Sequence, residues 1–113
     1  MSQDPKLSAE PDSLERPEHG GRLLARLLEA GTDEAVYAVA IANSAATWTG
    51  RARVTHADGR VDAFEWQPSD TPPSWLTQAT HALLRSAWQR CRAGHPWPRR
   101  LARWRPSPEE ADA

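Results

Sequence analysis

The feature that most constrains this chain is the stretch from Thr71 to Arg92, which has the pattern of one amphipathic helix. Its apolar residues recur at spacings of three and four, which places them on a single side of a helix. Pro72 and Pro73 are tolerated in the first turn, where the backbone N–H groups have no intrahelical partner. Gly94 predicts the end of the helix, because glycine accepts the left-handed conformation of a C-terminal cap. The apolar stripe contains Leu76, Ala79, Leu83, Ala87, Trp88 and Cys91.

A length of 113 residues and a net charge of −1 indicate one small domain, but the charge is unevenly placed. Residues 1–34 contain eight acidic and four basic residues, whereas residues 85–105 contain seven arginines and no acid. A folded body of this size buries a limited share of its surface. Part of its stability is therefore expected from a partner or from self-association.

The single cysteine, Cys91, excludes an intrachain disulfide and favours a reducing compartment. No apolar run approaches the roughly 20 residues that span a bilayer. The first thirty residues also lack the apolar core of a signal peptide. We therefore expect a cytoplasmic protein without a membrane partner.

Three segments are expected along the chain. Residues 1–21 form a disordered, acidic, proline-containing arm, because their composition buries too little surface to offset the entropy of ordering. Residues 22–105 form an α+β domain, and residues 106–113 form an acidic tail.

Within the domain, Arg22–Ala30 is predicted to be a short helix that Gly31 ends. Ala35–Asn43 is predicted to be a strand, because it contains β-branched residues and precedes an Asn-Ser turn signal. Alanine would also favour a helix there. Both sides of this strand are apolar, which indicates a central strand or one covered on both sides.

Thr47–His56 and Arg60–Gln67 are predicted to form a β-hairpin. A two-residue loop would exchange the faces of the second strand, whereas a three-residue Ala57–Gly59 loop pairs Arg51 with Glu65. The three-residue loop is favoured, because burying each large aromatic residue contributes about 1.5–3 kcal/mol. The residues that it gathers on one face are Trp48, Ala52, Val54, Phe64 and Trp66.

Arg99–Arg105 is predicted to be a second short helix that begins near Pro98. Trp97, Leu101 and Trp104 would then share one side of it. The predicted fold is a three-stranded antiparallel sheet packed against the long amphipathic helix, in the order α-β-β-β-α-α.

The best functional candidate is the segment 85–105, which interleaves arginine with tryptophan. Guanidinium groups pair with phosphates or carboxylates, and indoles stack on bases or anchor protein interfaces. We predict a non-enzymatic protein-binding module, such as an adaptor, an accessory subunit or an inhibitor-type partner. Nucleic-acid binding by the same arginines and structural self-assembly are the alternatives, the latter with the tail docked on the core. The predicted contact residues are Trp97, Arg99, Arg100, Arg103, Trp104 and Arg105.

No catalytic, cofactor or metal site is predicted. Cys91 and His95 have a spacing that suits a metal, and His81 lies near, but a structural zinc site needs a second pair of ligands. The hairpin side that carries Arg51 and Arg53 is either a second binding surface or the solvated side of a sheet.

Overall fold

The computed structural model describes residues 16–69 and 71–108, apart from the side chains of residues 63 and 64. This part of the chain contains five strands and one long helix. The strands form one antiparallel sheet in the order β4-β3-β2-β1-β5. The elements are β1 (Gly21–Ala30), β2 (Glu34–Ala42), β3 (Thr47–Thr55), β4 (Val61–Gln67), α2 (Ser74–Arg92) and β5 (Arg100–Arg105). Most of the predicted disordered arm lies outside the described residues.

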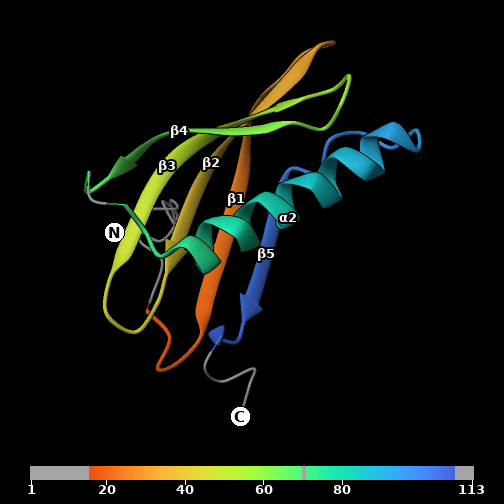
Figure 1. The fold of residues 1–113 in the computed structure, drawn as a ribbon. Coiled ribbons are helices and arrows are strands. Elements are labelled where there is room, and N and C mark those ends of the chain that lie inside the picture. Colours follow the sequence, from red (N-terminus) through yellow and green to blue (C-terminus); the bar gives the residue numbers. More distant parts are fainter. Residues whose placement is uncertain (1–15, 70, 109–113) are drawn as a thin grey trace, which may run out of the picture.

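The molecule has two layers, because α2 lies across one face of the five-stranded sheet (Figure 1). β4 and β5 are the two edges of the sheet, and the chain passes from one edge to the other through α2. The predicted order α-β-β-β-α-α with a three-stranded sheet is therefore wrong. Two segments predicted as short helices are strands, so the fold is mostly β with one described helix.

The first correction concerns Arg22–Ala30, which forms most of β1. Its paired leucines fit a helical period, but Leu23 and Ala25 also alternate with Arg22 and Leu24 at the period of a strand. Leu23 and Ala25 are buried, whereas Arg22 is exposed. β1 pairs with β2 on one side and with β5 on the other. Because β1 pairs with a strand on each side, the strand period prevails over the helical one in this segment.

The second correction concerns Arg99–Arg105, which forms β5 from Arg100 onward. Leu101 packs against the core, whereas Trp104 lies on the opposite side of the strand and is 46% exposed. Trp97 precedes the strand and is buried. The predicted common stripe of Trp97, Leu101 and Trp104 is therefore wrong, because residues three apart face opposite sides of a strand.

The strand predicted at Ala35–Asn43 is confirmed as β2, and it is central in the sheet. The residues on its α2 side include Tyr37 and Ile41, which are fully buried. Ala40 and Ala42 point to the other side and are also buried. The apolar character of both sides therefore reflects a strand that is enclosed by neighbours.

The predicted β3–β4 hairpin is confirmed, but its loop is longer than predicted. The Thr55 N–H donates to the Arg60 carbonyl (2.9 Å), so Thr55 and Arg60 close the hairpin. The loop between them has four residues, 56–59. A bulge between Gly50 and Ala52 then restores the predicted register, with Gly50 opposite Trp66. As a result Trp66 packs on the core side, as predicted.

The expected helix is present as α2, and its apolar stripe faces the sheet. Gly94 ends it with φ +102°, and the His95 N–H donates to the Arg90 carbonyl (3.1 Å), which is the pattern of a glycine-terminated helix. The residues of α2 that are buried are Leu76, Thr80, Leu83, Leu84, Ala87 and Trp88. Ala79 and Cys91 are partly buried against the same core.

Candidate functional site: the outer edge of β5 and the arginine face

β5 is an edge strand that pairs with β1 on one side only. The Leu27 N–H donates to the Arg99 carbonyl (2.8 Å) just before the strand begins. In antiparallel sheets such hydrogen-bonded pairs recur at every second residue, which directs the backbone groups of Leu101 and Arg103 toward β1. The alternate residues present their N–H and C=O groups at the outer edge. They are Arg100, Ala102 and Trp104.

Three contacts fix the segment that leads into β5. Trp97 is 8% exposed, and its ring lies edge-on to that of His56 at 6.2 Å. The Tyr37 hydroxyl donates to the Pro98 carbonyl at 2.7 Å. Burial, and to a smaller extent the nearby Cys91, raises the pKa of Tyr37 above its usual value, so the hydroxyl remains a donor. Trp97, a predicted contact residue, is therefore placed in the core.

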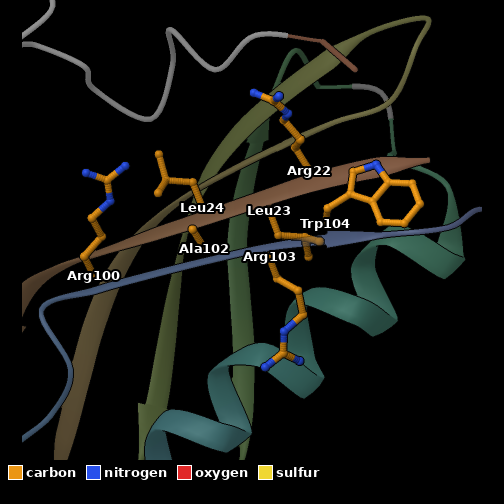
Figure 2. A pocket seen from close by; sticks show the side chains of 7 residues that line it. All are labelled: Arg22, Leu23, Leu24, Arg100, Ala102, Arg103 and Trp104. Carbon is orange, nitrogen blue, oxygen red and sulfur yellow. The ribbon is translucent and has the colours of Figure 1, made fainter. Parts of the chain in front are cut away.

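The predicted contact arginines are divided between the two sides of β5. Arg103 is paired with the buried Leu23 and points toward α2, as Figure 2 shows. Arg100 is paired with Arg26 and points to the opposite side of the sheet (Figure 2). All four are exposed: Arg99, Arg100, Arg103 and Arg105.

Trp104 is the predicted contact residue with the most exposed apolar surface. Its indole N–H donates to the His19 carbonyl at 3.1 Å, and the two rings lie edge to face at 5.9 Å. It borders a shallow hollow of about 370 Å³ that Arg22, Leu24 and Ala102 also line (Figure 2). Leu23 and Arg103, which lie on the α2 side of the sheet, also line this hollow, so its lining comes from both sides of β1 and β5.

That side of the sheet carries five arginines, and we call it the arginine face. The arginines come from three strands, β1, β3 and β5, at positions that alternate with core residues. They are Arg22, Arg26, Arg51, Arg53 and Arg100. The two on β1 do not appear among the predicted contact residues, because that segment was predicted to be a helix. The signal was present in the sequence, because Arg22 and Arg26 stand at even positions whereas the odd positions between them, Leu23 and Ala25, are apolar.

The register arranges these arginines in rows across the sheet. One row runs from Arg100 through Arg26 and Ala38 to Arg51. A second row places Trp104 beside Arg22, followed by Ala42 and Thr47, and between the two rows lie Ala102, Leu24, Ala40 and Thr49. None of these three rows, as formed by β5, β1, β2 and β3, contains an acidic residue.

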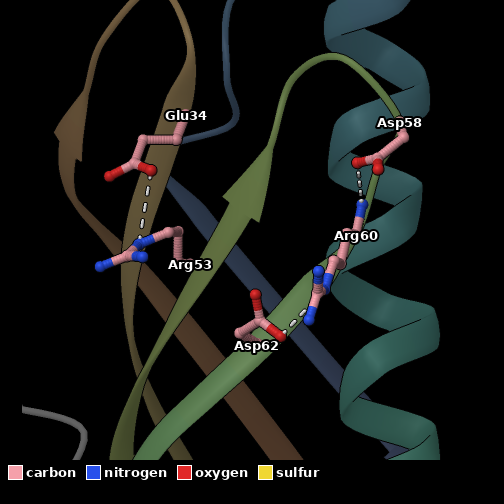
Figure 3. Close-up of polar contacts among 5 residues, drawn as sticks. All are labelled: Glu34, Arg53, Asp58, Arg60 and Asp62. Carbon is pink, nitrogen blue, oxygen red and sulfur yellow. Dashed lines mark hydrogen bonds and ion pairs between the residues drawn. The ribbon is translucent and has the colours of Figure 1, made fainter.

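Two ion pairs lie toward the β3–β4 hairpin (Figure 3). Arg53 Nε is 3.4 Å from a carboxylate oxygen of Glu34, and Arg60 Nε is 3.3 Å from a carboxylate oxygen of Asp62. The side chains of Glu34 and Arg53 are both more than 40% exposed. The arginine face is therefore partly neutralised at the hairpin end.

Two other arginines of the predicted 85–105 segment lie on α2, away from β5, and contact a tryptophan of the same helix. Arg85 and Arg92 lie over the ring of Trp88, with 5.6 and 5.3 Å from guanidinium carbon to ring centroid. The Trp88 indole N–H donates to the His56 carbonyl at 2.7 Å. This hydrogen bond joins the C-terminal half of α2 to the β3–β4 turn, while the two arginine contacts lie within α2.

The described residues contain no group of three or more His, Cys, Asp or Glu placed to hold a metal ion. None of the helices in the described part of the chain is long and apolar enough to cross a membrane. In comparisons with known proteins, no family model, no curated protein and no solved structure matches this chain.

Proposed function

We propose that this protein is a non-enzymatic binding module that captures an acidic, extended segment of a partner protein. The segment adds to the sheet as a further strand along β5. The observation that carries the proposal is the outer edge of β5, where the backbone groups of every second residue face away from the sheet. Strand addition uses such backbone groups for affinity and the flanking side chains for specificity.

The charges beside this edge support an acidic partner. β5 carries arginine on both of its sides, so an added strand would have basic neighbours on each face. Trp104 adds an exposed apolar surface, and tryptophan with arginine is typical of residues that dominate binding energy. Carboxylates at alternating positions of the added strand would pair with these guanidinium groups.

The same charges disfavour self-assembly through this edge. If β5 paired with its copy in a second molecule, each copy would contribute Arg99, Arg100, Arg103 and Arg105 to a single seam. Like charges on adjacent strands are destabilising, and charged edges are a common protection against such pairing. We further propose a reducing, cytoplasmic setting, in keeping with the free Cys91.

The test uses the full chain and a synthetic peptide of about six residues, a typical strand length, in which glutamate alternates with valine. Strand addition should increase the hydrogen-exchange protection of the outward amides of Arg100, Ala102 and Trp104. The amides of Leu101 and Arg103 already face β1, so their protection should change much less. A peptide with lysine in place of glutamate should not bind.

Ala102→Pro removes one outward N–H, and its site tolerates proline because that N–H takes no part in pairing with β1. We expect the variant to fold and to lose peptide affinity by about tenfold, the equivalent of one backbone hydrogen bond at about 1.4 kcal/mol. Ala102→Val retains the N–H and is the matched control. Unchanged affinity of Ala102→Pro, or peptide binding without protection of the β5 amides, would refute strand addition.

A further inference from the structure

We propose that the exposed side of α2 is a second binding site, which inserts into the major groove of double-stranded DNA. This site is on the helix layer and uses side chains, whereas the proposed function uses the backbone groups at the outer edge of β5. It is therefore an independent inference. We call this side of the helix the helix face, and its residues are Gln78, His81, Arg85, Gln89 and Arg92.

The helix face is one continuous stripe of polar and basic side chains. Its residues are three or four positions apart, so they follow a single line along α2, on the side opposite to the stripe that packs on the sheet. All five are exposed. From Gln78 to Arg92 the helix advances about 21 Å, so the stripe is long enough to meet several base pairs.

The surroundings of the helix face contain no negative charge from the same part of the chain. Residues 71–108 include seven arginines and no acidic residue. Within the described part of the protein, none of Arg85, Arg90 and Arg92 forms an ion pair. The first turn of α2 lacks an acid as well, although the helix dipole would favour one there. The dipole therefore accounts for the arginines of the last turn, but the absence of acids along the whole helix points to a polyanionic partner.

Two arginines of the helix face are held by Trp88. The guanidinium carbons of Arg85 and Arg92 lie 5.6 and 5.3 Å from the centroid of its ring. The indole is itself fixed, because its N–H donates to the His56 carbonyl and a Cβ at Gly59 would lie 2.6 Å from its ring. The ring offers no oxygen acceptor, so the guanidinium N–H groups are left for phosphates or for guanine. Groups ordered in this way lose less entropy on binding.

Further arginines flank the helix face. Two residues of a helix correspond to a rotation of about 200°, so Arg90 projects from the side of α2 opposite to Trp88. Arg103 of β5 points toward α2 (Figure 2). Both arginines are exposed. Their positions suit the phosphates beside a groove that holds the helix.

The exposed side chains favour DNA over a protein partner at this site. No large apolar residue of α2 is exposed, whereas Leu28 of β1 and Trp104 of β5 are. Protein interfaces depend on buried apolar or aromatic anchors. Interfaces with DNA are more polar and more positively charged, as the helix face is.

The same exposed residues favour a duplex over a single strand. Bases of a single strand stack on exposed aromatic rings, but Trp88 is only 8% exposed. A helix of about 10–12 Å diameter fits the major groove of B-DNA, which is about 12 Å wide, and not the deep, narrow major groove of double-stranded RNA. In that groove glutamine pairs with adenine and arginine with guanine, and the helix face offers both side chains.

The experiment titrates the full chain into a fluorescently labelled DNA duplex of about 20 base pairs and follows anisotropy at several salt concentrations. With three or four phosphate contacts, the slope of log affinity against log salt should be about −3. The variant Arg85→Gln/Arg90→Gln should reduce affinity by about tenfold or more at low salt. Its slope should be shallower by about 0.9 for each phosphate contact that is lost. Methylation of guanine N7, an acceptor in the major groove, should also weaken binding.

The matched control is Arg22→Gln/Arg51→Gln, which removes the same charge from exposed positions on the other side of the sheet. We expect less than about a twofold change in its affinity, because charges far from the phosphates are screened. Circular dichroism and thermal unfolding would verify that both double variants retain the fold.

Four results would overturn the inference: no binding of the duplex by the wild-type chain at low salt, an equal loss in the two double variants, no effect of guanine N7 methylation, or equally tight binding of a single strand, an RNA duplex or polyglutamate of matched charge. Ala102→Pro separates this inference from the proposed function, since it should leave affinity for the DNA duplex within about twofold. In turn, Arg85→Gln/Arg90→Gln should leave affinity for the glutamate–valine peptide within about twofold.

Discussion

On the α2 side of the sheet, buried side chains of β1, β2 and β3 form one apolar core with the helix, and side chains of β4 and β5 pack against it. On the other side, arginines of β1, β3 and β5 lie on either side of the alanines that β2 presents there. The contrast is visible within single strands, since β1 alternates buried residues such as Leu23 with exposed ones such as Arg22. The two faces of the sheet therefore differ in kind: one packs against the helix, and the other carries arginines.

The contrast predicts unequal costs for neighbouring residues, and the largest expected effect is at Leu23. This residue is 2% exposed within the core under α2, whereas Leu24 is half-buried on the arginine face. Leu23→Ala should lower the free energy of unfolding by about 2–5 kcal/mol, because it leaves a cavity in a packed core. Leu24→Ala should cost less than half of that. Denaturant unfolding with a constant m-value measures both, and equal losses would show that the second face is as important for stability as the first.

A smaller effect is expected at Tyr37, which lies on the α2 side of central β2 and holds the segment before β5. Tyr37→Phe leaves the Pro98 carbonyl without this donor and should cost about 1–3 kcal/mol. Hydrogen exchange at Leu101 and Arg103 should also become faster, if this hydrogen bond restrains β5. Unchanged stability and exchange would show that Trp97 alone anchors the segment.

The same hydroxyl makes the free energy of unfolding depend on pH, and the direction of this dependence follows from the raised pKa of Tyr37. A tyrosine that titrates at higher pH when folded contributes stability that is complete below its unfolded pKa of about 10. That contribution is lost as pH rises above this value, because the unfolded chain releases the proton more readily. Denaturant unfolding between pH 8 and about 11 should therefore show a steeper decline for the wild-type chain than for Tyr37→Phe.

The two faces also differ in how much of them the sequence predicts. The long helix and the hairpin are predictable from local sequence patterns. The helix shows apolar residues at spacings of three and four from Leu76 to Cys91, and the hairpin shows alternating polar and apolar residues on both sides of the turn at Gly59. At Gly50, next to the bulge, a Cβ would lie 2.6 Å from the Glu65 carbonyl oxygen and 2.9 Å from the Trp66 ring, so only glycine permits this close approach. Such contacts do not show in the alternation itself.

The arginine face was harder to predict because it is assembled from segments that pair only in the folded chain. Both β1 and β5 fit a helical period over their short lengths, and each becomes a strand because the other supplies its edge partner. The prediction that Trp104 and Trp97 share one side of a helix is wrong for the same reason, because this segment also becomes a strand by pairing with β1. Arg51 and Arg53 were recognised as one side of a hairpin, but their neighbours Arg26 and Arg100 come from segments about 25 and 50 residues away along the chain, which no local period reveals.

The smallest expected effect tests the arginine face itself, at the ion pair of Glu34 with Arg53. Both side chains are more than 40% exposed, so solvent screens their attraction and a coupling of at most about 1 kcal/mol is expected. A double-mutant cycle with Glu34→Gln and Arg53→Gln, followed by denaturant unfolding at low and high salt, measures it. The coupling should fall as salt rises. A coupling of several kcal/mol that does not change with salt would mean that this ion pair is a structural contact.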